Sequence, residues 1–152
     1  MSDKFIQQQR VEREQLRRLL ATMKPLLDRC RTETPSEIEL SALAACLHSL
    51  YTGIENIFKR ATVELDGRPV TGENWHRELL NQMARPGESR GPVISGECRT
   101  RLAEYLAFRH VFRNAYSFDL HWNKMRHLVL GAEEILAEVE AELDRFLAKN
   151  PE

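Results

Sequence analysis

Residues 40–61, LSALAACLHSLYTGIENIFKRA, form the stretch of sequence that decides the fold. Apolar side chains recur there three and four residues apart for about six turns, a spacing that places them on one face of a helix. The members of this apolar face are Leu40, Leu43, Ala44, Leu47, Leu50, Tyr51, Ile54, Ile57, Phe58 and Ala61. The segment is therefore predicted to be a long amphipathic helix that packs against other helices.

Both ends of this helix carry signals in the sequence. The run Thr34-Pro35-Ser36-Glu37 fits a capping box, with threonine as the N-cap, proline at the first helical position and glutamate at the third. The turn-forming residues 66–69, DGRP, are typical of a helix end.

Four further segments have the same helical spacing and complete the predicted fold. They cover approximately residues 4–31, 73–84, 95–116 and 122–147. Pro25 lies inside the first of them and is expected to kink or split it, because proline lacks the backbone donor and clashes with the preceding turn. The chain is thus predicted to be all-α, an antiparallel bundle of four to five helices that forms a single domain over residues 1–152.

Composition and short motifs exclude several classes of protein. A net charge of -1 excludes an overall basic field of the kind that attracts nucleic acid. No apolar run approaches the roughly 18 residues that a membrane span needs, and the N-terminus lacks the apolar core of a signal peptide. Cys30, Cys46 and Cys98 lie far apart without zinc-ligand spacing, which indicates reduced thiols in a cytoplasmic protein. No phosphate-binding glycine loop, esterase elbow or zinc-protease motif is present, so no metal or cofactor is expected.

The apolar pattern breaks in the helix predicted over 95–116, and this break is the candidate site. Arg109, Arg113 and Tyr116 lie on one line of that helix at positions i, i+4 and i+7, and the arginines lie on or beside the apolar face. His110 and Asn114 form a parallel line next to them. Two cations, an imidazole, an amide and a phenol are therefore predicted to form one polar patch.

Two interpretations of this patch stay open at the level of spacing. Paired arginines suit phosphate and a neighbouring histidine can move a proton, which favours RNA cleavage without metal by attack of the ribose 2'-OH. Alternatively, the arginines form structural ion pairs with Glu133, Glu134 or Glu138, and the chain is a helical adaptor.

The stretch FRHVFRNAYSFDLHW, residues 108–122, resembles the HEPN superfamily, in particular the HepT-like ribonuclease toxins of bacterial toxin–antitoxin pairs. The similarity also takes in NWHRELL, residues 74–80, and the order of long and short helices. The resemblance implies a homodimer formed through the motif helices, with an RNA-cleaving cleft between them that needs no metal. It implies that Arg109 contacts the scissile phosphate and that His110 is the polar residue after it. Tyr116 then corresponds to the tyrosine to which a nucleotidyltransferase antitoxin adds nucleotide.

Asn114 departs from this family pattern, because it stands where the family has its histidine. An amide has no proton that titrates near neutral pH and cannot act as the acid or base. Three explanations stay open: His110 moves the proton, the chain is a non-catalytic member, or the substitution was introduced. The sequence predicts a metal-independent endoribonuclease toxin with Arg109, His110 and Asn114 at the catalytic centre and Arg113 as a further RNA contact. The alternative is an inactive module of the same fold that binds RNA, a nucleotide or a protein.

Overall fold

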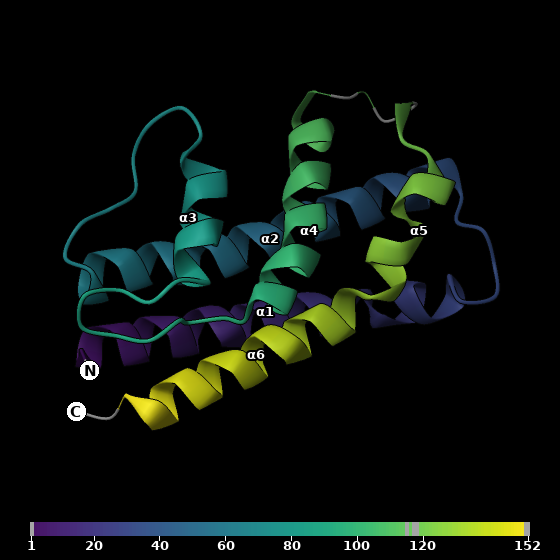
Figure 1. Ribbon diagram of the computed structural model, residues 1–152. Helices are drawn as coiled ribbons and strands as arrows, with labels where there is room; N and C mark the ends of the chain where they lie inside the picture. The colour runs from purple at the N-terminus through teal and green to yellow at the C-terminus, as the bar shows by residue number, and fades with distance from the viewer. Residues whose placement is uncertain (1, 115, 117–118, 151–152) are drawn as a thin grey trace.

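The computed structural model describes residues 2–114, 116 and 119–150, without the side chain of Asn114. This part of the chain contains six helices and no strand, which confirms the all-α bundle (Figure 1). The helices are α1 (Asp3–Arg29), α2 (Glu37–Leu65), α3 (Trp75–Met83), α4 (Gly96–Asn114), α5 (Trp122–Leu130) and α6 (Ala132–Lys149).

The central element is α2, which packs against each of the other five helices described. The two longest helices, α1 and α2, pair along their length, and α6 runs beside α1 (Figure 1). The shorter helices α3 and α4 stand next to each other across α2. Side chains on α2 can therefore meet groups from both α3 and α4.

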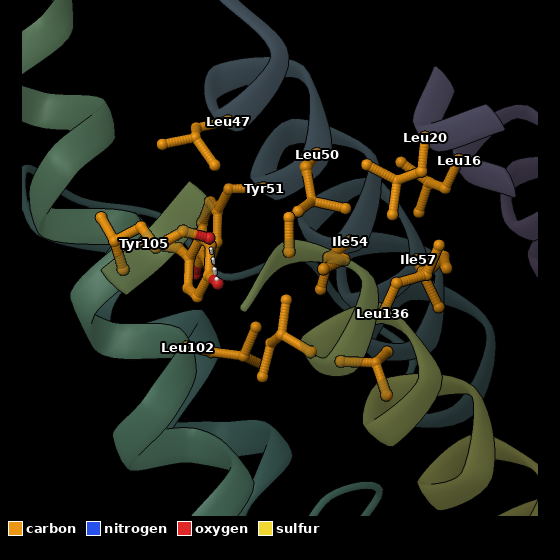
Figure 2. Close-up of a cluster of buried hydrophobic side chains, with 14 of the residues drawn as sticks. Leu16, Leu20, Leu47, Leu50, Tyr51, Ile54, Ile57, Leu102, Tyr105 and Leu136 are labelled. Atoms are coloured by element: carbon orange, nitrogen blue, oxygen red, sulfur yellow. Dashed lines mark hydrogen bonds between the residues drawn. The ribbon is translucent and has the colours of Figure 1, made fainter. Parts of the chain in front are cut away.

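Apolar side chains from four helices meet in the core around α2 (Figure 2). Leu16 of α1, Ile54 of α2, Leu102 of α4 and Leu136 of α6 are all buried there. Burial of one such side chain contributes roughly 1.5–3 kcal/mol. Gly53 permits the close approach of α1, because a Cβ at this position would collide with the side chain of Leu16.

The N-cap of α2 lies two residues later in the chain than the sequence predicted. Ser36, rather than Thr34, is the N-cap: its hydroxyl accepts a hydrogen bond from the Glu39 backbone N–H, and the Glu39 carboxylate accepts one from the Ser36 N–H. Arg29 of α1 also forms an ion pair with Glu39. This contact between helices stabilises the capping box of Ser36 and Glu39 in place of the predicted one.

The segment predicted as one helix over 122–147 is two helices, α5 and α6, which meet at Gly131. The break leaves carbonyl groups at the end of α5 without helical partners. The buried Tyr105 hydroxyl, from α4, donates a hydrogen bond to one of them, the Leu128 carbonyl, at 2.8 Å. Contact with α4 therefore stabilises a break that helical spacing alone does not reveal.

The expected split at Pro25 does not occur, because α1 continues through this residue to Arg29. Leu20 and Leu27 are buried on either side of the proline, so packing holds both halves of the helix.

All three cysteines are free thiols in the interior. Within the ranges that the structure describes, none of the helices combines the length and apolar character that crossing a membrane requires.

Candidate functional site

Arg109 lies on the face of α4 that is turned toward α2, as the helical spacing predicted. Its side chain is only 12% exposed, and its Nη1 donates a hydrogen bond to Oε1 of Glu55 at 2.6 Å. A buried guanidinium needs such a partner, because an isolated charge in a low-dielectric interior is costly. The pair fixes the position of Arg109 relative to the central helix.

Glu55 connects this arginine to a third helix. The carboxylate is 3% exposed, and its second oxygen, Oε2, lies 2.7 Å from Nδ1 of His76, at the start of α3. Arg109 Nη1 and His76 Nδ1 are 3.5 Å apart. We call Glu55, His76 and Arg109 the acid–histidine–arginine cluster; its members come from α2, α3 and α4.

The contact with Glu55 determines which ring nitrogen of His76 carries a proton. A carboxylate only accepts hydrogen bonds, so His76 Nδ1 must be the donor. The lone pair of a neutral His76 is then on Nε2, for which the described residues supply no hydrogen bond. The neighbouring ring of Trp75, centred 3.5 Å from the imidazole, limits the movement of the histidine.

Two polar atoms at this site are buried without a hydrogen-bond partner in the described part of the chain. They are Arg109 Nε and the Tyr51 hydroxyl oxygen. Burial raises the pKa of Tyr51 strongly, and nearby Glu55 adds to this effect while Arg109 opposes it. Buried polar atoms without partners are uncommon and often mark a position where a ligand or water completes the bonding.

His48, on α2, lies beside α4, the helix that carries Arg109. Its ring centre is 5.4 Å from that of Phe112. Burial lowers the pKa of His48, the positive charges of Arg109 and Arg113 lower it further, and Glu55 acts in the opposite direction. The neutral form of His48 is therefore favoured, and both predicted phosphate-binding arginines lie close enough to influence it.

The other residues predicted for the site face more open surroundings. His110 and Arg113 are exposed on α4, and Tyr116 is 72% exposed. The Asn114 side chain lies outside the described part of the structure, so its predicted place in the site stays a prediction.

The ion pairs that the adaptor interpretation required do not form with Arg109 or Arg113. Glu133 instead contacts Lys24, while Glu134 and Glu138 contact Arg101. The partner of Arg109 lies on α2 and not on the last helix. The expectation about these three glutamates was therefore wrong.

A groove of about 930 Å³ is lined by Trp75, the residue before His76, but by none of the three cluster residues. It is bounded by α1, α2 and the segment before α3, and it includes the exposed cations Lys59 and Arg60. Lys59 Nζ lies 5.2 Å from the centre of a Trp75 ring. The groove thus offers positive charge and amide groups beside Trp75.

Sequence reasoning missed Glu55 and His76 as site residues. Glu55 carried a signal, since it is a carboxylate one residue after Ile54 within the most apolar helix of the chain. His76 lies in the stretch NWHRELL that resembles the family, but nothing in the sequence indicated its contacts, because its partners are 21 and 33 residues away along the chain. Only the packing of α3 beside α4 brings it to the arginine.

Comparison with known proteins identifies a family for this chain. A family model described as "HepT-like protein" matches residues 42–150, a range that includes Glu55, His76 and Arg109. Neither the comparison with curated proteins nor that with solved structures found a match.

Proposed function

The chain belongs to the HepT-like protein family, and from this membership we propose that it is a metal-independent endoribonuclease, the toxin of a toxin–antitoxin pair in the cytoplasm. One observation of this structure supports the proposal independently of family membership. A buried carboxylate holds Arg109 beside a histidine, so a phosphate-binding group and a proton-transfer group are fixed within one site. Such fixed groups stabilise a transition state without reorganisation at the moment of reaction.

Arg109 is the proposed contact to the scissile phosphate. Glu55 occupies only Nη1, and the edge formed by Nε and Nη2 makes no hydrogen bond with the described residues. Nε is buried, so bidentate binding of two phosphate oxygens along this planar edge requires the side chains around it to move. Arg113, exposed one turn farther along α4, is proposed as a further contact to the RNA backbone.

The reaction proposed is cleavage by the RNA itself. The 2'-oxygen attacks the adjacent phosphorus, the bond to the 5'-oxygen breaks, and the products are a 2',3'-cyclic phosphate and a 5'-hydroxyl. A histidine beside the phosphate would move the proton, typically a contribution of about 10²–10⁴ in rate. Two histidines qualify: His110 by its place in the sequence motif, and His76 by its place in the structure.

We propose a nucleotidyltransferase antitoxin as the partner that controls this activity. The exposure of the Tyr116 side chain supports the proposal, because a modifying enzyme must reach the phenol. Incubation with a candidate antitoxin and ATP is expected to add nucleotide to the protein but not to a Tyr116→Phe variant. Modification of that variant to the same extent would place the modified residue elsewhere.

A second candidate function is binding without catalysis. Asn114 stands where the family has its histidine, and the Arg109–Glu55 pair is also what a structural ion pair would look like. On this alternative, the same surface holds RNA, a nucleotide or a protein, and no bond is broken.

Cleavage of bacterial total RNA by the purified protein in EDTA distinguishes the two functions. The parent is expected to cut, and Arg109→Ala to lose at least about 100-fold in rate, in line with the loss of one charge-stabilising donor. Arg31→Ala is the matched control, because Arg31 is an exposed arginine at the end of α1. Binding of RNA without cleavage by the parent and by Asn114→His would favour the binding module.

A further inference from the structure

We propose that His76 is the proton-transfer residue of this site and supplies the function of the family histidine that Asn114 replaces. The inference rests on the proposed ribonuclease function. It concerns a residue outside the motif helix, brought to the site by the packing of α3.

The orientation of the imidazole ring suits His76 to this role. Glu55 Oε2 accepts a hydrogen bond from Nδ1–H, which turns Nε2 away from the buried carboxylate. A carboxylate behind a histidine fixes the tautomer and stabilises the imidazolium that forms when Nε2 takes up a proton. The side chain is 27% exposed, so a substrate can approach it.

His76 also lies close to Arg109, the proposed phosphate-binding group. His76 Nδ1 lies 3.5 Å from Arg109 Nη1, and one carboxylate binds both side chains. A nucleotide is large compared with an imidazole ring, so a phosphate bound at the guanidinium of Arg109 would lie beside the ring of His76. Proton transfer requires such proximity before any adjustment of pKa matters.

Three other histidines, His110, His48 and His127, are placed differently. His110 is exposed on α4, whereas Arg109 faces inward. His48 packs against Phe112. His127, on α5, lies 3.8 Å from Glu104. Of His48, His76 and His127, only His76 contacts the carboxylate that holds Arg109 within the described residues.

His76 Nε2 takes the proton from the 2'-hydroxyl as the 2'-oxygen forms its bond to phosphorus. The bond between phosphorus and the 5'-oxygen breaks, and the 5'-oxygen takes a proton from water. The hydroxide left behind removes the proton from the imidazolium, which restores the neutral histidine.

The test separates catalysis by His76 from its structural contact with Glu55. In His76→Asn, the amide can still donate to Glu55, but the nitrogen at the Nε2 position is absent. We expect a loss of cleavage of roughly 10²–10⁴-fold, with an unchanged melting temperature. Affinity for a fluorescein-labelled random-sequence RNA with 2'-O-methyl groups, which cannot be cleaved, should also be unchanged. Added imidazole should restore part of the activity of His76→Ala, and His127→Asn is the matched control.

Each result decides the question. If the parent cuts RNA and His76→Asn cuts at a similar rate, the inference fails while the proposed function stands. A large loss in His110→Asn with none in His76→Asn also overturns it. If the parent is silent and Asn114→His cuts, the scaffold is a ribonuclease, but His76 does not replace the family histidine. If neither cuts, both the inference and the proposed function fail.

Discussion

Glu55 is the residue on which the geometry of the candidate site depends. It is a nearly inaccessible carboxylate in the central helix, with a guanidinium on one oxygen and an imidazole on the other. Each partner compensates for the loss of water around the charge, and the low dielectric strengthens both contacts. The same residue therefore links folding stability to the positions of Arg109 and His76.

Substitution of Glu55 should reveal this coupling. Glu55→Ala leaves Arg109 as a buried cation without a counter-charge, and loss of one partner of a buried pair costs about 3–5 kcal/mol. We expect a decrease of this size in the free energy of unfolding, measured by urea denaturation. The matched control is Glu73→Ala, an exposed glutamate before α3, which should change stability by less than about 0.5 kcal/mol. Equal effects of the two substitutions would contradict the role assigned to Glu55.

At the scale of the helices, local sequence predicts where helices form better than where they end. The apolar face over 40–61 predicted α2, the element against which every other described helix packs. The sequence predicted Thr34 as its N-cap, whereas the structure has Ser36 there, next to the ion pair of Arg29 with Glu39. The break at Gly131 was not predictable from spacing, because the Tyr105 hydroxyl from another helix satisfies the freed carbonyl.

The candidate site was predictable only in part, because the local sequence does not reveal contacts between helices. The sequence placed Arg109 on the inner face of its helix, since a charge within an apolar face is visible from spacing alone. It did not reveal Glu55 or His76 as partners, because contacts between helices depend on how α2, α3 and α4 pack. Helical spacing predicts which residues share a face of one helix. It does not predict which residues of three different helices come into contact, because that depends on the tertiary structure.

At the scale of the whole molecule, the end of α4 carries features expected of an interface. Val111 is 58% exposed, and the exposed Tyr116 lies shortly beyond it. We propose that the protein forms a homodimer through this helix, because apolar side chains exposed together commonly mark interaction surfaces.

Sedimentation equilibrium tests this assembly. The parent is expected to be a dimer, and Val111→Asp should shift it toward monomer, since a charge would be buried without a partner. Ile38→Asp is the matched control, an equally apolar exposed residue at the start of α2. A monomeric parent, or a dimer unaffected by Val111→Asp, would contradict an interface at this helix.

The chemistry of the RNA ends tests the central claim most directly. RNA cleaved by the purified protein in EDTA should carry 2',3'-cyclic phosphate and 5'-hydroxyl ends, and these ends should be absent after incubation with Arg109→Ala. This is the outcome of 2'-oxygen attack at a site where Arg109 stabilises the phosphate charge. Products with 5'-phosphate and 3'-hydroxyl ends, or cleavage only when a divalent metal is added, would contradict the account.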